Sequence, residues 1–154
     1  MPIDQATFRK SMESNRRLTV RTIEAFPAHE LFHFVPVEGL RPFSEMIIEI
    51  LHMELGYMRG IARNEWIFDE PYAGVDSKKG LLDACTEQSR KVQTYWADIT
   101  DGKLVEVEQD PFWGGPQSHY ERLFYSLENE IHHRGQGYIY LRMLGIEPPA
   151  FYER

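Results

Sequence analysis

The stretch that decides the predicted fold reads LENEIHHRGQ and occupies residues 127–136, inside a longer segment that spans residues 118–144. Apolar residues in this segment return about once per helical turn, which is the pattern of an amphipathic helix. Ser118 is a suitable N-terminal cap, and Gly145 suits the position just beyond the last turn. The segment therefore predicts a long final helix that carries several metal-ligand or acid–base side chains close together.

Three earlier segments show the same helical period: residues 4–25, 42–61 and 79–99. Asp4 and Ser77 are suitable caps for the first and third segments, and Pro42 suits the first turn of the second. Residues 26–42 form a longer connection than two antiparallel neighbours need, which indicates one crossover. With no convincing sheet, the four helical patterns predict an all-α, four-helix bundle.

A short extended excursion is expected just before the last helix. Asp101-Gly102 reads as a turn, and the alternating LVEVE at residues 104–108 follows it, as in the first half of a hairpin. The run PFWGGP at residues 111–116 is expected to end the excursion. This segment therefore predicts a short hairpin within an otherwise helical chain.

Length and composition narrow the class of protein. The chain has 154 residues, of which 42% are hydrophobic, so residues 1–154 are expected to form a single domain. A formal net charge of −7 provides no general attraction for a nucleic-acid backbone. The sequence shows neither the apolar core of a signal peptide nor a charge-free membrane span. Cys85 is the only cysteine, which fits a cytoplasmic setting, and its apolar neighbours indicate a small buried side chain.

Two pairs of side chains suggest a metal site between the second and last helices. Glu49 and His52 lie one turn apart, and Glu130 and His133 repeat this Glu-x-x-His spacing. Bundles commonly build metal sites from side chains on facing helices, and imidazole suits zinc, nickel, copper or ferrous iron. His132 and His133 point about a quarter turn apart, so only one of them is expected to face inward.

Each of these residues also has a plainer structural interpretation. A histidine such as His52 among apolar residues is often a hydrogen-bonded core side chain, and an isolated glutamate on a helix is usually a solvated charge. Gly135 is expected to let a neighbouring helix approach closely, despite its low helix propensity. These alternatives stay open on the residues alone.

The run NEIHHRGQ (129–136), the downstream YLRMLGIEPPAFYE (140–153) and a histidine on the second helix resemble the DinB-like, YfiT-type family of four-helix bundles, the DNA-damage-inducible family. The resemblance implies a metal-binding bundle, often a homodimer. It further implies one histidine ligand on the second helix and a His-x-x-x-His pair on the last.

Transferred to this chain, the implied ligands are His52 and His133, while Asn129 occupies the position of the third histidine. An asparagine oxygen is a weaker ligand than imidazole for borderline metals. The expected cofactor is a divalent metal, zinc or nickel, and the auxiliary candidates are Glu49, Glu130 and His132.

Three functions remain open from the sequence, and with them the question of whether the chain is an enzyme. Some proteins of the resembling family are thiol-dependent transferases, so the first is a metal- and thiol-dependent transferase acting on a small electrophile. The second is a non-catalytic, homodimeric stress-associated or binding protein with a degenerate metal site. The third is a di-iron protein, in which the Glu-x-x-His pairs are joined by further carboxylates: Glu13 or Glu24, and Asp83 or Glu87.

Overall fold

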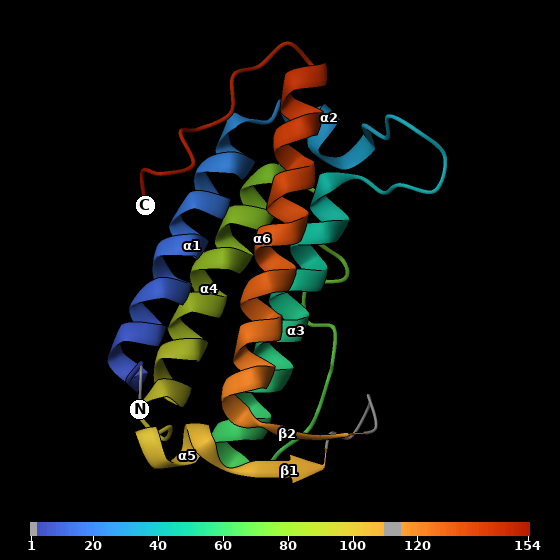
Figure 1. Ribbon diagram of the computed structural model, residues 1–154. Coiled ribbons are helices and arrows are strands. Elements are labelled where there is room, and N and C mark those ends of the chain that lie inside the picture. Colours follow the sequence, from blue (N-terminus) through green and yellow to red (C-terminus); the bar gives the residue numbers. More distant parts are fainter. Residues whose placement is uncertain (1–2, 110–114) are drawn as a thin grey trace.

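The computed structural model describes residues 3–109 and 115–154 of the chain. Its elements are α1 (Gln5–Ala25), α2 (Ala28–His33), α3 (Phe43–Arg63), α4 (Lys78–Trp96), α5 (Asp101–Val105), β1 (Val107–Gln109), β2 (Pro116–Ser118) and α6 (His119–Met143). The four long helices run side by side, with α2 and the β1–β2 hairpin at opposite ends of the bundle (Figure 1). The predicted four-helix bundle is confirmed. Within the described residues, no helix combines the length and apolar character that a membrane span requires.

The predicted caps begin three of the four long helices. The Asp4 side chain accepts the backbone N–H of Thr7 at 2.7 Å, and Ser77 caps α4 in the same way. Ser118 forms a reciprocal pair with Glu121: its Oγ accepts the Glu121 N–H at 3.2 Å, while the Glu121 carboxylate accepts the Ser118 N–H at 2.7 Å. These bonds satisfy backbone donors that a helix leaves without internal partners, so they set where each helix starts.

The connection between α1 and α3 crosses the end of the bundle, as predicted. Both α1 and α3 pack against α4 and α6, so α1 and α3 stand diagonally opposite each other. Residues 26–42 span this diagonal and contain the short helix α2, which the sequence did not predict; Leu31 anchors it in the core. His29 and His33 lie on α2 with their rings stacked, at 4.4 Å between centroids, in a connection at the molecular surface.

The hairpin before α6 is confirmed, since β1 and β2 pair in antiparallel fashion. Its predicted start is wrong, because residues 101–105 form the helix α5 and not a turn with an extended strand. The Thr100 hydroxyl accepts the backbone N–H of Lys103 at 3.1 Å, and Leu104 is fully buried. The Thr100 cap and the buried Leu104 side chain therefore stabilise a short helix here, although the alternating sequence pattern is typical of a strand. Of the predicted end at residues 111–116, residues 111–114 lie outside the described part.

A polar layer divides the hydrophobic core into two clusters. One cluster lies at the α2 end of the bundle and the other at the hairpin end. Between them every long helix contributes buried polar side chains: Asn15, Arg16 and Thr19 from α1, Glu54 from α3, Gln88 from α4, and Glu130 and Arg134 from α6. Because buried polar groups must be paired, this layer constrains how the helices fit together.

The close approach of α3 and α6 occurs at Gly137. A Cβ atom on Gly137 would lie 2.4 Å from Cε2 of Phe43. At Gly135 a Cβ atom would meet nothing within 4 Å, so the prediction of a close helix contact there is wrong. Gly135 faces solvent, whereas Gly137 lies on the buried face of α6.

Candidate functional site

Glu130, one of the predicted auxiliary ligands, forms hydrogen bonds with side chains of α1. Its carboxylate accepts hydrogen bonds from Arg16 Nε at 2.9 Å, Arg16 Nη2 at 3.1 Å and Thr19 Oγ1 at 2.6 Å. Arg16 Nη2 also lies 3.1 Å from Glu54 Oε2. Glu130 therefore belongs to the polar layer and is turned away from the α3–α6 contact.

The α3–α6 contact brings together Glu49 and His133. Nε2 of His133 lies 3.2 Å from Oε1 of Glu49, and Nδ1 of His133 lies 2.9 Å from Oε1 of Gln136. Both partners are oxygens that can only accept, so each ring nitrogen donates only when it carries a proton. In the neutral ring with its proton on Nδ1, Nε2 is the unprotonated atom directed at the carboxylate. The Gln136 side chain thus fixes the orientation of the imidazole ring.

Arg41 is the second partner of Glu49, to which its Nη2 donates a hydrogen bond. Burial raises the pKa of Glu49, but hydrogen bonds from Arg41 and His133 outweigh this effect, and the pKa lies below its ordinary value. Glu49 is therefore a carboxylate at neutral pH. Together with His133 Nε2, it presents negative charge and a ring nitrogen at one point of the helix contact.

His52 lines a cavity of ≈ 480 Å³ together with Glu49, between α3 and the loop that follows it. The backbone N–H of Tyr72 donates to His52 Nε2 at 3.1 Å, and the two rings are stacked with centroids 5.8 Å apart. Burial lowers the pKa of His52, so its ring is neutral at pH 7. Its Nε2 is already occupied by a hydrogen bond and is not directed at His133.

The remaining candidates on α6 differ in exposure. His132 is exposed, while His133 is buried, so the inward-facing member of the adjacent pair is His133. Asn129 lies one turn before His133, and its Nδ2 atom is buried without a hydrogen-bond partner in the described residues. An unpaired buried amide is costly in a folded protein, so this position is suited to an additional polar ligand.

The structure also assembles a group that the sequence analysis missed. Glu106, Glu108 and His119 are the described residues whose ligand atoms all lie within 4.8 Å of one another, a spacing that could hold a metal ion. His119 Nε2 lies 3.8 Å from Glu108 and 4.0 Å from Glu106. In the sequence, Glu106 and Glu108 are visible as two carboxylates at alternate positions of LVEVE. Their proximity to His119 arises only from the pairing of β1 with β2.

Arg122 opposes metal binding in this second group. Its Nη1 donates to Nδ1 of His119 at 2.9 Å, and an arginine has no acceptor, so the neutral ring carries its proton on Nε2. A metal at Nε2 would have to displace that proton while Nδ1 still accepts from Arg122. The group is therefore less suited to a cation than the Glu49–His133 pair, whose Nε2 is not protonated in the neutral ring.

The proposed bridging carboxylates of a di-iron site lie at the molecular surface. Three of them form ion pairs one turn away on their own helices: Glu13 with Arg9, Asp83 with Lys79, and Glu87 with Lys91. Glu24 is exposed. Carboxylates in these positions cannot bridge two irons between the helices, so the geometry does not support this hypothesis.

Cys85 is buried, as expected, on α4. Burial raises the pKa of its thiol to about 11, so it is not a thiolate at neutral pH. Cys85 therefore does not supply a nucleophile.

The fold and the α3–α6 contact define a helical bundle whose facing helices present a histidine and a carboxylate to each other. The DinB family model matches residues 1–154, and the chain belongs to the DinB family.

Solved structures support the same fold. A DinB-like protein of Bacillus subtilis (YjoA) superimposes with a TM-score of 0.76 at 20% identity, over 96% of this chain and 97% of that one. A DinB-like protein of Bacillus cereus ATCC 10987 gives a TM-score of 0.78 at 19% identity, also over 96% and 97%. None of the curated protein sequences matches the chain.

Proposed function

We propose that the chain binds a divalent metal ion, zinc or nickel, at the contact between α3 and α6. The donors are His133 Nε2 and the Glu49 carboxylate, with Asn129 as a third, weaker donor. One observation carries the proposal: His133 Nε2 points at Glu49 Oε1 across 3.2 Å while Gln136 holds the opposite side of the ring.

The tautomer of His133 explains why this pair suits a cation. With the Nδ1 proton directed at Gln136, an unprotonated Nε2 and the Glu49 carboxylate are two acceptors facing each other. Such a pair requires either a second proton on the ring or a metal ion between the two atoms. A ring nitrogen held by a hydrogen bond on its other side is the usual arrangement of a histidine ligand.

Asn129 gives the site a further polar atom. Its buried Nδ2 atom lacks a partner in the described residues, and rotation about the last side-chain bond exchanges this nitrogen for the oxygen. The amide oxygen is a weaker ligand for zinc or nickel than a histidine nitrogen. Arg41 binds the other carboxylate oxygen of Glu49, Oε2, and its positive charge opposes a cation at Oε1. Both features favour weak, reversible metal binding.

Thiol-dependent transfer is the chemistry that best suits such a site. A bound divalent metal supplies Lewis acidity, which lowers the pKa of a thiol and favours attack on an electrophile. The thiol must come from a small cosubstrate, because Cys85 is buried and protonated. The ≈ 480 Å³ cavity lined by Glu49 and His52 offers space for it, within the size range of small-molecule sites. The proposal includes a cytoplasmic location and a homodimeric assembly.

Two adjacent histidines make a matched test of the metal site. His133→Gln removes the proposed ligand, whereas His132→Gln removes an exposed histidine next to it. We expect the wild type and His132→Gln to retain zinc or nickel after loading and gel filtration, and His133→Gln to lose it, by elemental analysis. Equal metal contents in the two variants would refute the proposed ligand.

The transferase step has a separate readout. The metal-loaded wild type is mixed with cysteine or glutathione and an aromatic chloride. The thiolate displaces chloride, so formation of the thioether and release of chloride are followed together with loss of the thiol. Turnover that depends on added metal and disappears in His133→Gln supports the transferase. Metal binding without any thiol consumption favours the non-catalytic alternative.

A further inference from the structure

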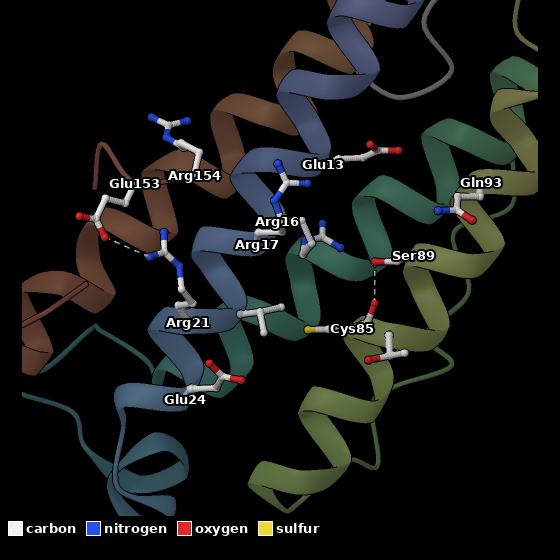
Figure 2. Close-up of a pocket in the computed structure, with 12 residues that line it drawn as sticks. Glu13, Arg16, Arg17, Arg21, Glu24, Cys85, Ser89, Gln93, Glu153 and Arg154 are labelled. Carbon is white, nitrogen blue, oxygen red and sulfur yellow. Dashed lines mark hydrogen bonds and ion pairs between the residues drawn. The ribbon is translucent and has the colours of Figure 1, made fainter. Parts of the chain in front are cut away.

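A second cavity, the α1–α4 cavity, has a volume of ≈ 610 Å³ and shares no lining residue with the cavity beside Glu49 and His52. Cys85 points from α4 toward α1, and Arg21 extends from α1 toward Glu153 (Figure 2). The cavity falls within the size range of small-molecule sites. Four arginines line it: Arg16, Arg17, Arg21 and Arg154.

Three of these arginines have guanidinium nitrogens without partners in the part of the chain that the structure describes. Arg16 binds Glu130 and Glu54 through Nε and Nη2, and its Nη1 makes no hydrogen bond. The Nη2 atom of Arg21 is buried without a hydrogen-bond partner, and the nearest carboxylate, Glu153, lies 3.9 Å from its Nη1. Arg17 forms no ion pair within the described ranges.

The acidic residues of the cavity only partly offset this charge. Of the three carboxylates that line the cavity, Glu13 is held by Arg9 at 2.7 Å, Glu24 is exposed, and Glu153 lies 3.9 Å from Arg21. Arg17 and Arg21 are like charges one turn apart on α1, which is an unfavourable pairing in a helix. A cavity with several unsatisfied guanidinium nitrogens therefore exists on a chain whose net charge is −7.

The opposite wall of the cavity carries no charge. The wall on α4 is formed by Cys85, Thr86, Ser89 and Gln93, while Val20 lies on α1 beside the arginines. The raised pKa of the Cys85 thiol, about 11, keeps it uncharged at neutral pH. Ser89 uses its hydroxyl proton within α4, donating to the Cys85 carbonyl at 2.9 Å. The cavity thus combines guanidinium groups on α1 with an uncharged wall on α4.

We propose that the α1–α4 cavity binds a small organic oxyanion, a carboxylate or phosphate monoester with a short apolar body. The oxyanion lies between Arg17 and Arg21, where guanidinium groups can form charge-assisted hydrogen bonds to it. The apolar body lies against Val20 and Cys85. This inference is independent of the metal site, because the two share no donor residue.

Binding is tested by calorimetry on the full chain at fixed ionic strength, with four probes. Hexanoate and hexyl phosphate carry both the oxyanion and the apolar body, inorganic phosphate carries the oxyanion alone, and hexanol carries the body alone. We expect saturable one-to-one binding of hexanoate or hexyl phosphate, and the tighter of the two identifies the headgroup. Inorganic phosphate and hexanol should bind more weakly than either.

Arginine variants provide the site-specific control. Arg17→Gln together with Arg21→Gln should weaken binding of the preferred probe roughly tenfold or more, since charge-assisted hydrogen bonds are lost. Arg90→Gln removes an exposed charge from α4 outside the cavity and should leave binding unchanged. Arg17→Gln alone, at an exposed position, gives a second test if the double variant folds poorly.

Three outcomes would overturn the proposal. They are no saturable binding of hexanoate or hexyl phosphate, equal binding of hexanol, and equal losses in the Arg17 and Arg90 variants.

Discussion

Arg16 on α1 and Glu130 on α6 form a buried, two-point ion pair, with Nε to Oε1 at 2.9 Å and Nη2 to Oε2 at 3.1 Å. Arg16 also contacts Glu54, whose pKa burial raises above its ordinary value. These contacts join three helices at the polar layer between the two hydrophobic clusters. They also explain why Glu130, although one turn from His133, does not face the α3–α6 contact.

Glu130→Ala should destabilise the bundle. Removing Glu130 leaves Arg16 Nε buried without its acceptor, although Arg16 Nη2 keeps its contact with Glu54, so we expect a cost of about 1–3 kcal/mol. The free energy of unfolding, measured by urea denaturation, is the readout. Glu128→Ala, at an exposed position on the same helix, is the matched control and should change stability by less than about 0.5 kcal/mol. Similar losses in both variants would show that the ion pair contributes little.

Two glycines on α6 should respond to alanine in opposite directions. Gly137→Ala places a Cβ atom 2.4 Å from the Phe43 ring, so we expect a loss of about 1–3 kcal/mol from overpacking. Gly135→Ala meets nothing within 4 Å and should gain about 0.5–1 kcal/mol from helix propensity. Thermal unfolding of the two variants measures both effects. A stabilised Gly137→Ala would mean that α3 and α6 can separate at no cost.

Asn129→His should increase affinity for zinc or nickel. The imidazole replaces a weaker amide donor one turn before His133, so we expect roughly a tenfold or greater gain in affinity. A competition titration against a chromogenic chelator measures the dissociation constant. Asn129→Ala should bind no more tightly than the wild type. If Asn129→His gains nothing, position 129 does not face the metal.

His119 should make the fold less stable in mild acid. Burial lowers its pKa below the ordinary value of 6.5, so the folded chain resists protonation that the unfolded chain accepts. The neutral His119 side chain therefore makes its full contribution to the free energy of unfolding above pH 6.5. This contribution is lost as the pH falls through the pKa that His119 has in the folded chain.

Replacing this histidine tests the pH effect. The decrease in unfolding free energy between pH 7.5 and about 5.5 should be smaller in His119→Gln than in the wild type. His52, whose pKa is also lowered, accounts for part of the remaining decrease. Measurements at pH 8 report the packing change alone. An unchanged pH dependence in His119→Gln would mean that His119 does not contribute to it.

Local patterns predicted most of the helical elements. Asp4, Ser77 and Ser118 cap α1, α4 and α6 because each supplies a side-chain acceptor next to the first turn, and this depends only on neighbouring residues. The errors in secondary structure occurred where one buried anchor decides a short element. Leu31 stabilises α2 and Leu104 stabilises α5, and neither segment is long enough to show a helical period.

The sequence by itself determined the bundle, its caps, the crossover and the family resemblance, because these depend on periodicity and short motifs. Tertiary structure decided which ligand candidates meet. Glu130 turns to Arg16, His52 accepts from Tyr72, and His133 points at Glu49. The physical reason is that a helical period places a side chain on a face, whereas its partner depends on how the facing helices are rotated and packed.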